Sequence, residues 1–286
     1  MSSSKNIIPI KFKEVTSRTA IANWYDYYDV NAGAIVLNTG IVVIDSLMYP
    51  IQAKQFKEAL EKKSGLPVTT LFLTHIHGDH LFGMASFRDT KIICSNILIE
   101  VIKRKLENEW TKDAFDEWKE EEPAIAEYIK DIEILVPTLG FDEQYVLEDR
   151  DLRVEFYLSG GHTSCSSYAY FPEEKVLFAG DLISAGFWPF ISDPGGDPEK
   201  WMKSLEHMLS FGDITVVPGH GPIVDKKCIE EQLEFMKKLK NSLLNAIKDD
   251  LKPEEIELPQ FYEPAVDWQI PRALDFLLKY YSTLEE

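Results

Sequence analysis

The fold of this chain is decided by the stretch Thr74-His75-Ile76-His77-Gly78-Asp79-His80, which carries the pattern HxHxDH. The stretch directly follows Val68–Leu73, an apolar run with the length and composition of a buried strand. Neutral imidazole and carboxylate are ligands that Zn²⁺, Fe²⁺ and Mn²⁺ accept. Four such groups within six residues at a strand end predict a metal centre. The alternative is a polar loop with coincidental histidines, which the preceding strand disfavours.

Three further predicted strands each lead to a candidate ligand. These pairs are Leu152–Leu158 with His162, Lys175–Phe178 with Asp181, and Ile214–Val217 with His220. Sheets with helical cover place their sites at strand ends, where loops converge over a rigid frame. A single convergent site is therefore the economical interpretation. Taken alone, His162 and His220 could be ordinary turn histidines, and a Gly-Asp pair such as Gly180-Asp181 is common in turns.

Two other polar residues have a weaker claim to a role in the site. Asp45 ends the apolar strand Ile41–Ile44, so its carboxylate can either cap a turn or accept a hydrogen bond from a ligand histidine. We expect the second arrangement, in which Asp45 orients a ligand without binding the metal itself. His207 lies beside an apolar stripe on a predicted helix, and we expect it to be structural.

The remaining sequence predicts one domain, residues 1–286, built from alternating strands and helices. The expected elements are a hairpin of Ala34–Leu37 with Ile41–Ile44, a helix over Ile51–Lys63, a helical insertion around residues 97–132 and C-terminal helices around residues 225–286. The insertion is either a wall of the site or an outer layer. The apolar, aromatic stretch 183–190 after Asp181 is either core packing or a second wall.

Composition narrows the class of protein and of substrate. The net charge of −18 disfavours a nucleic-acid partner, because an acidic surface repels phosphate. No apolar run approaches the roughly 20 residues that span a bilayer, and residues 1–10 lack an export signal. The three cysteines, Cys94, Cys165 and Cys228, are widely spaced and suggest no disulfide framework. We therefore expect a cytoplasmic enzyme with a small-molecule substrate and no membrane partner, and a homodimer stays open.

The four motifs in this order resemble the metallo-β-lactamase superfamily, from about Asn31 to Gly221. The resemblance implies an α/β fold (α+β in some classifications), a four-layer αββα sandwich with a dinuclear site at one edge. It also implies which residues bind the two divalent ions, zinc foremost with iron or manganese as alternatives. The implied ligands are His75, His77 and His162 for the first ion and Asp79, His80 and His220 for the second, with Asp181 bridging both.

The resemblance further implies a metal-dependent hydrolase, in which two ions generate a bridging hydroxide that attacks the substrate. Asp79 would orient the attacking water or carry its proton to the leaving group. The β-lactamases of this fold do not use a bridging aspartate, so Asp181 makes the chain similar to the thioesterase, lactonase and phosphoesterase branches. An ester, thioester or lactone of a small molecule is the expected substrate. The alternatives are a phosphoesterase and a non-haem iron redox enzyme similar to the persulfide dioxygenases.

Overall fold

The computed structural model describes residues 10–24 and 29–284. Residues 1–9, where the absence of an export signal was inferred, lie outside the described residues. The chain divides into two compact units. The N-terminal unit comprises residues 1–140 and 148–152, and the C-terminal unit comprises residues 141–147 and 153–286. The single domain expected for residues 1–286 stays a prediction beside these two units.

The sheet of the N-terminal unit has the strand order β1 to β6. Its strands are β1 (Lys11–Glu14), β2 (Thr19–Trp24), β3 (Val30–Val36), β4 (Ile41–Ile44), β5 (Val68–Phe72) and β6 (Lys91–Ser95). Neighbours are antiparallel as far as β4, and β3 with β4 forms the predicted hairpin. The pairs β4–β5 and β5–β6 are parallel. The loops that follow β4 and β5 therefore start at the same edge of the sheet.

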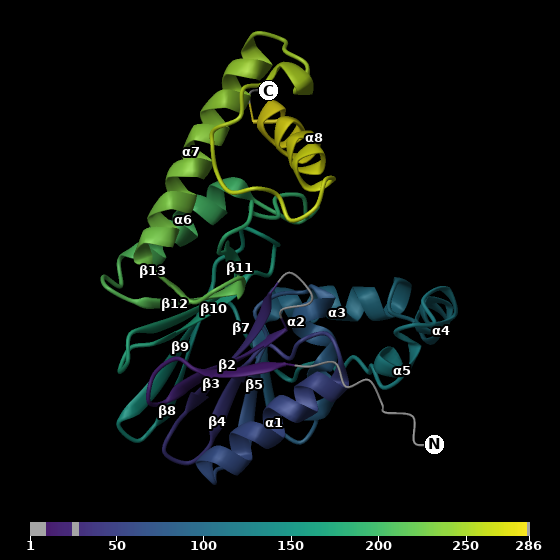
Figure 1. Cartoon of the computed structure of the whole chain (residues 1–286), viewed down its shortest axis with the longest axis vertical. Helices are drawn as coiled ribbons and strands as arrows, with labels where there is room; N and C mark the ends of the chain where they lie inside the picture. The colour runs from purple at the N-terminus through teal and green to yellow at the C-terminus, as the bar shows by residue number, and fades with distance from the viewer. Residues whose placement is uncertain (1–9, 25–28, 285–286) are drawn as a thin grey trace. The chain divides into compact units, whose positions relative to one another are not determined.

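Helices cover this sheet and follow its ligand loop. The helix predicted over Ile51–Lys63 is confirmed as α1 (Pro50–Ser64), which buries Phe56 and Leu60 and lies along the strands of its unit in Figure 1. The remaining helical elements of this unit are α2 (Gly78–Leu81), η1 (Phe82–Phe87), α3 (Asn96–Asn108), α4 (Lys112–Glu121) and α5 (Ala126–Ile129). Helices α3 to α5 thus occupy the stretch in which a helical insertion was expected. The short strand β7 (Leu139–Phe141) ends this part of the chain.

The C-terminal unit has a second run of strands, again with helices packed on it. The strands are β8 (Gln144–Asp149), β9 (Leu152–Leu158), β10 (Ser167–Phe171), β11 (Val176–Ser184), β12 (Thr215–His220) and β13 (Val224–Asp225). The pairs β9–β10 and β10–β11 are antiparallel, whereas β11–β12 is parallel. Strands β9, β11 and β12 therefore run in one direction. Their C-terminal ends, which lead to the candidate ligands of this unit, share one edge.

The structure corrects the expected end of the strand before Asp181. The strand was expected to end at Phe178 and to be followed by a turn that contains Gly180-Asp181, but β11 continues to Ser184 and carries Asp181 inside it. Pairing with β12 shifts register on both sides of Gly180, so the strand is irregular at this point rather than finished. Likewise β12 extends to His220 instead of stopping at Val217. The two candidate ligands, Asp181 and His220, therefore lie on strand backbone and not on free turns.

Helices α6 (Pro198–Leu209), α7 (Lys226–Lys248) and α8 (Gln269–Ser282), with the short η2 (Pro253–Glu255), complete the C-terminal unit. Helix α7 packs beside both α6 and α8. The core beneath them includes Leu177 of β11, Trp201 of α6 and Phe235 of α7. Within residues 10–24 and 29–284, no helix is long and apolar enough to cross a bilayer. The mixed sheets with helical cover confirm the predicted α/β class.

Candidate metal centre

The N-terminal unit presents its candidate ligands on one sharp turn between β5 and α2. His75 is buried, His77 is the N-cap of α2, and Asp79 and His80 lie in the first turn of that helix. The ring centroid of His75 lies 4.8 Å from that of His77 and 4.5 Å from that of His80. A Cβ at position 78 would lie 2.6 Å from the ring of Phe82, so glycine at this position lets that ring pack closely against the turn. The turn therefore gathers three imidazoles and a carboxylate in a small volume.

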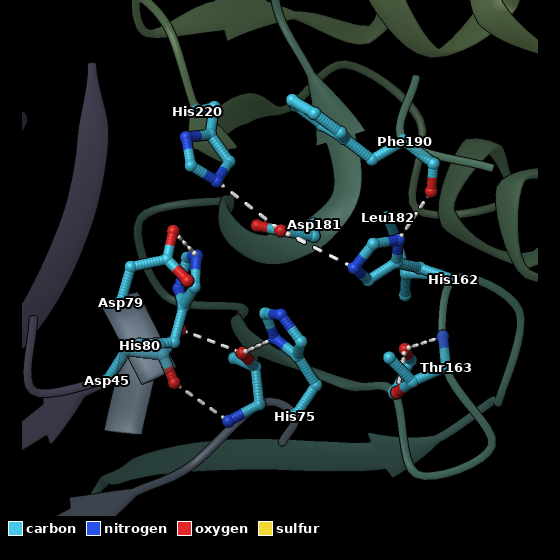
Figure 2. A network of polar contacts seen from close by, with 12 residues as sticks. Asp45, His75, Asp79, His80, His162, Thr163, Asp181, Leu182, Phe190 and His220 are labelled. Atoms are coloured by element: carbon cyan, nitrogen blue, oxygen red, sulfur yellow. Dashed lines mark hydrogen bonds and ion pairs between the residues drawn. The ribbon is translucent and has the colours of Figure 1, made fainter. Parts of the chain in front are cut away.

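Asp45 fixes the orientation of two of these histidines through a buried network (Figure 2). Its carboxylate accepts hydrogen bonds from Thr74 N at 2.8 Å, Thr74 Oγ1 at 2.7 Å and His80 Nδ1 at 2.9 Å. Because Thr74 Oγ1 donates to Asp45, it accepts from His75 Nδ1 at 2.9 Å. This network assigns the Nδ1 protons of His75 and His80 and makes Nε2 the lone-pair nitrogen of each ring. Asp45 thus makes the contact expected of a residue that orients a ligand.

The C-terminal unit gathers its three candidate ligands around one carboxylate oxygen. Asp181 Oδ2 lies 3.5 Å from His162 Nε2 and 3.4 Å from His220 Nε2 (Figure 2). The backbone carbonyl of Phe190 accepts a hydrogen bond from His162 Nδ1 at 2.9 Å. This bond places the lone pair of His162 on Nε2, the atom that faces Asp181. All three side chains are buried, with Asp181 only 5 % exposed.

These separations suit ligands of a common metal ion better than hydrogen-bond partners. Good hydrogen bonds between nitrogen and oxygen are about 2.7–3.2 Å long. Two ligands at tetrahedral positions around zinc, each about 2.0–2.1 Å from it, lie about 3.3–3.4 Å apart. The two distances to Asp181 match that edge, and Asp79 Oδ2 with His80 Nε2 at 3.7 Å comes near it. The residues present therefore fit a divalent cation, whose charge would also offset the cost of burying Asp181.

Residues outside the motifs hold Asp181 in place. The carbonyl of Leu182, the next residue, accepts hydrogen bonds from Trp201 Nε1 at 2.9 Å and Gln232 Nε2 at 2.7 Å. On the other side, a Cβ at Gly219 would lie 2.0 Å from Asp181 Oδ1, so only glycine leaves room for the carboxylate. The contacts of Trp201 and Gln232 with Leu182 could not be predicted, because both residues lie within ordinary amphipathic helix patterns. A buried glutamine inside an apolar stripe was the one signal available.

The helical insertion around residues 97–132 packs on a residue that follows the HxHxDH turn. In the helical insertion, Trp110, Phe115 and Trp118 surround Phe82, with ring centroids 5.2, 5.7 and 6.3 Å from it. Phe82 comes two residues after His80, so the insertion packs onto the end of the ligand turn in its own unit. Helix α4 has no buried residue, and its aromatic rings are only half-buried.

The stretch 183–190 divides between the two roles considered for it. Trp188 belongs to the core and packs edge to face on Phe235, with ring centroids 5.2 Å apart. Phe190 is half-buried instead, and its ring centroid lies 6.1 Å from that of His220. Phe190 thus borders two ligands of this unit, one through its ring and the other through its carbonyl.

Other reactive side chains in the C-terminal unit have structural surroundings. His207 lies on α6, and its Nδ1 shares a hydrogen bond with the hydroxyl of Tyr168. Burial raises the pKa of the Cys228 thiol to about 11, so the thiol stays protonated at neutral pH and is a poor nucleophile. His162, Asp181 and His220 therefore remain the candidate functional residues of this unit.

Comparison with known proteins places these motifs. The family model of the metallo-β-lactamase superfamily matches residues 25–220. A metallo-β-lactamase type 2 of Bacillus cereus is 28% identical over 214 residues, which are 73% of this chain and 74% of the relative. The metallo-β-lactamase IND-1 of Chryseobacterium indologenes is 25% identical over 216 residues, 74% of this chain and 80% of the relative. The solved structure of a metallo-β-lactamase from Pontibacter korlensis superposes on this chain with a TM-score of 0.64 and 19% sequence identity. The superposition covers 80% of this chain and 99% of the Pontibacter chain. The last similarity concerns the fold alone and confirms the predicted fold class.

Proposed function

We infer the function of this chain from the family to which it belongs, the metallo-β-lactamase superfamily. The chain is a metal-dependent hydrolase of that superfamily. We propose more specifically that it binds two divalent ions, zinc foremost, and cleaves an ester, thioester or lactone of a small molecule. The proposed ligands are His75, His77 and His162 for one ion and Asp79, His80 and His220 for the other, with Asp181 bridging.

The observation that carries this proposal is the position of Asp181. One of its oxygens lies at metal-ligand separation from both His162 and His220, two histidines that the family pattern assigns to different ions. A carboxylate between the two histidines can offer its negative charge to both cations, and oxygen is a ligand atom that divalent metal ions accept. Asp181 also supports the choice of substrate, because the β-lactamase branch does without a bridging aspartate. Two bound ions would supply an activated water and polarise the carbonyl under attack.

The protein's own residues would orient the reactants and move the proton. Asp79 is the most accessible of the three carboxylates at 17 % side-chain exposure, against 5 % for Asp181 and 3 % for Asp45. Asp79 is therefore the carboxylate best placed to accept a proton and pass it to the leaving group. Asp45 keeps the Nδ1 protons of His75 and His80 in place and is too enclosed for that exchange. Its role is to position ligands.

The setting of the enzyme is proposed from composition. The net charge of −18 favours a small-molecule substrate over a nucleic acid. We propose a cytoplasmic enzyme without a membrane partner, and a homodimer fits the same data. Cell fractionation and light scattering of the purified chain test these two points. Recovery of the native enzyme in an exported fraction would overturn the first.

Metal analysis combined with a substrate panel tests the proposal. Purified full-length enzyme should hold about two zinc ions per chain, and it should turn over a lactone, a thioester or an aryl ester faster than a chromogenic cephalosporin or a phosphodiester. Asp181→Asn should lower metal content and abolish turnover, whereas Asp213→Asn, an exposed carboxylate of the same unit, should change neither. Near-zero metal in a folded protein would overturn the dinuclear site. Oxygen consumption with a persulfide substrate would contradict the hydrolase proposal and favour the alternative, a non-haem iron redox enzyme.

A further inference from the structure

Helix α8 begins with an exposed tryptophan that is set between an aromatic ring and a cation. Trp268 is 45 % exposed, unusual for so large an apolar side chain. Its ring centroid lies 6.1 Å from that of Phe190, and the guanidinium carbon of Arg272 lies 4.6 Å from the Trp268 ring. All three residues lie outside the HxHxDH turn and belong to the C-terminal unit.

This aromatic row starts at the candidate metal ligands. Phe190 borders His220 through its ring, at 6.1 Å between centroids, and its carbonyl accepts the hydrogen bond from His162. Trp268 is the next ring outward, and Arg272 is the residue beyond it. A substrate group that contacts Phe190 and Trp268 would therefore be continuous with the ligands that act on the scissile bond.

The row rests on a fixed support rather than on a loose chain end. Gln269, only 1 % exposed, donates from Nε2 to the carbonyl of Trp188 and accepts from Ala265 N at 2.8 Å. Trp188 N donates to the carbonyl of Glu263 at 3.1 Å. The segment before α8 is thus bonded to the segment that carries Phe190. A surface that is already ordered loses little conformational entropy when a ligand binds.

The charge of Arg272 is available to a ligand. Arg88 and Arg153 each have a carboxylate partner, at 2.5 and 2.7 Å. Arg272 has none within 4.0 Å among residues 10–24 and 29–284, although the chain carries a net charge of −18. Arg272 and Lys279 also line a cavity of about 780 Å³, within the range of about 300–1,000 Å³ typical of small-molecule sites. Asp275 is the one acidic residue described in its lining, which does not include Phe190 or Trp268.

We propose that Phe190, Trp268 and Arg272 form the recognition site for the substrate, which carries a flat apolar group and a carboxylate. The assignment rests on the proposed hydrolase function and narrows its substrate class. The flat group would lie against the two aromatic rings, which favour offset or edge contacts with another ring. The guanidinium of Arg272 offers paired N–H donors that match the two oxygens of a carboxylate. Its stacking on Trp268 holds those donors at the end of the aromatic row.

A matched pair of thioesters tests this inference. S-Methyl (4-carboxyphenyl)thioacetate and its 4-carbamoyl analogue place the ring between the scissile thioester and a distal group, and they differ only in whether that distal group is charged. Metal-loaded full-length enzyme should prefer the carboxylate about fivefold in kcat/KM, the effect of roughly 1 kcal/mol from one exposed charge pair. Arg272→Gln should reduce that preference to about one, and Trp268→Ala should raise KM for both compounds. Lys203→Gln removes an exposed positive charge elsewhere in the unit and should leave the preference unchanged.

A binding measurement separates failure of this inference from failure of the proposed function. Calorimetric titration with phenylacetate and phenylacetamide reports on recognition without turnover. Binding of phenylacetate that Arg272→Gln weakens, in an enzyme that hydrolyses neither thioester, would retain the recognition site and overturn the hydrolase proposal. Turnover of both thioesters at equal rates, unchanged in Arg272→Gln and Trp268→Ala, would overturn the recognition site and leave the hydrolase intact.

Discussion

The two units hold their candidate ligands in contrasting ways. Both build their candidate sites on a pair of parallel strands, β4 with β5 in one unit and β11 with β12 in the other. The N-terminal unit concentrates four candidate ligands on one turn and orients two of them, His75 and His80, through a single carboxylate, that of Asp45. In the C-terminal unit Asp181 lies within β11, His220 ends β12 and His162 follows β9. The carbonyl of Phe190 accepts a hydrogen bond from His162, and that of Leu182 anchors the backbone beside Asp181.

Because of this difference, we expect different substitutions to disrupt the candidate ligands of the two units. A turn fixed by one buried carboxylate fails when that carboxylate is removed, because several donors then lose their acceptor together. A set fixed by carbonyls and close packing depends instead on side chains that never touch the metal. The N-terminal set should therefore respond most to a change of charge. The C-terminal set should respond most to changes of shape and of supporting hydrogen bonds.

Removal of Asp45 should produce the largest effect. In Asp45→Ala, Thr74 N, Thr74 Oγ1 and His80 Nδ1 lose a common buried acceptor. Hydrogen bonds to charged groups contribute about 1.5–3 kcal/mol each, so we expect the free energy of unfolding to fall by about 3 kcal/mol or more. Urea unfolding of the metal-free chain measures it, with the exposed Asp213→Ala as control. A loss as small as that of the control would refute the role of Asp45 as the organiser of this unit.

Two glycine-to-alanine substitutions, one in each unit, should show how strongly each set of candidate ligands depends on close packing. In Gly219→Ala the new Cβ would lie 2.0 Å from Asp181 Oδ1 and 2.7 Å from the backbone carbon of Gly180, which cannot move aside easily. In Gly78→Ala the nearest atoms, from 2.6 Å, belong to the Phe82 ring and thus to a side chain, which can shift more easily than backbone. Overpacking costs about 1–3 kcal/mol, and we expect the upper end for Gly219→Ala and the lower end for Gly78→Ala.

Zinc content and thermal unfolding of both glycine variants provide the measurement. Gly219→Ala should also lose zinc because the carboxylate of Asp181 is displaced. Gly195→Ala is the matched control, since its Cβ would meet no atom nearer than 3.2 Å. Equal losses of zinc in Gly78→Ala and Gly219→Ala would remove the proposed contrast between the two units.

The same contrast explains how much could be predicted from the sequence. The N-terminal set is local, so the pattern HxHxDH after an apolar strand was sufficient to locate it. The family motifs then pointed to His162, Asp181 and His220, but no short pattern revealed what supports them. Trp201 and Gln232 reach Leu182 from helices 19 and 50 residues further along the chain. Contacts of that kind follow from the packing of whole elements, and sequence periodicity describes each element alone.

The extent of β11 escaped prediction for a related physical reason. Gly180-Asp181 resembles a turn when only local preferences are considered. In the structure β11 runs through two register shifts, because pairing with β12 satisfies its backbone on both sides of the irregularity. Local preference was overridden by a partner strand more than thirty residues away. The predicted end of the strand before Asp181 was therefore wrong, while the role of Asp181 as a metal ligand stays a prediction.

The smallest expected effect on stability comes from Gln232→Leu, which tests support at a distance. The variant removes the 2.7 Å hydrogen bond to Leu182 and leaves that of Trp201 in place. It also removes Gln232 Oε1, a buried acceptor without a hydrogen bond among residues 10–24 and 29–284. The lost bond contributes about 1 kcal/mol and the relieved desolvation is of similar size, so the unfolding free energy of the metal-free chain should change by less than about 1 kcal/mol.

Zinc affinity should nevertheless fall in Gln232→Leu. The Leu182 carbonyl adjoins Asp181, so its loosening lets the carboxylate move relative to His162 and His220. Partners that orient metal ligands typically contribute about 10–100-fold to affinity, and we expect about tenfold here because Trp201 remains. Chelator competition measures the affinity, with the exposed Gln260→Leu as control. Unchanged affinity with lowered stability would make Gln232 a packing residue only, and the C-terminal set would then be held by Gly219 and the strand backbone without help from α7.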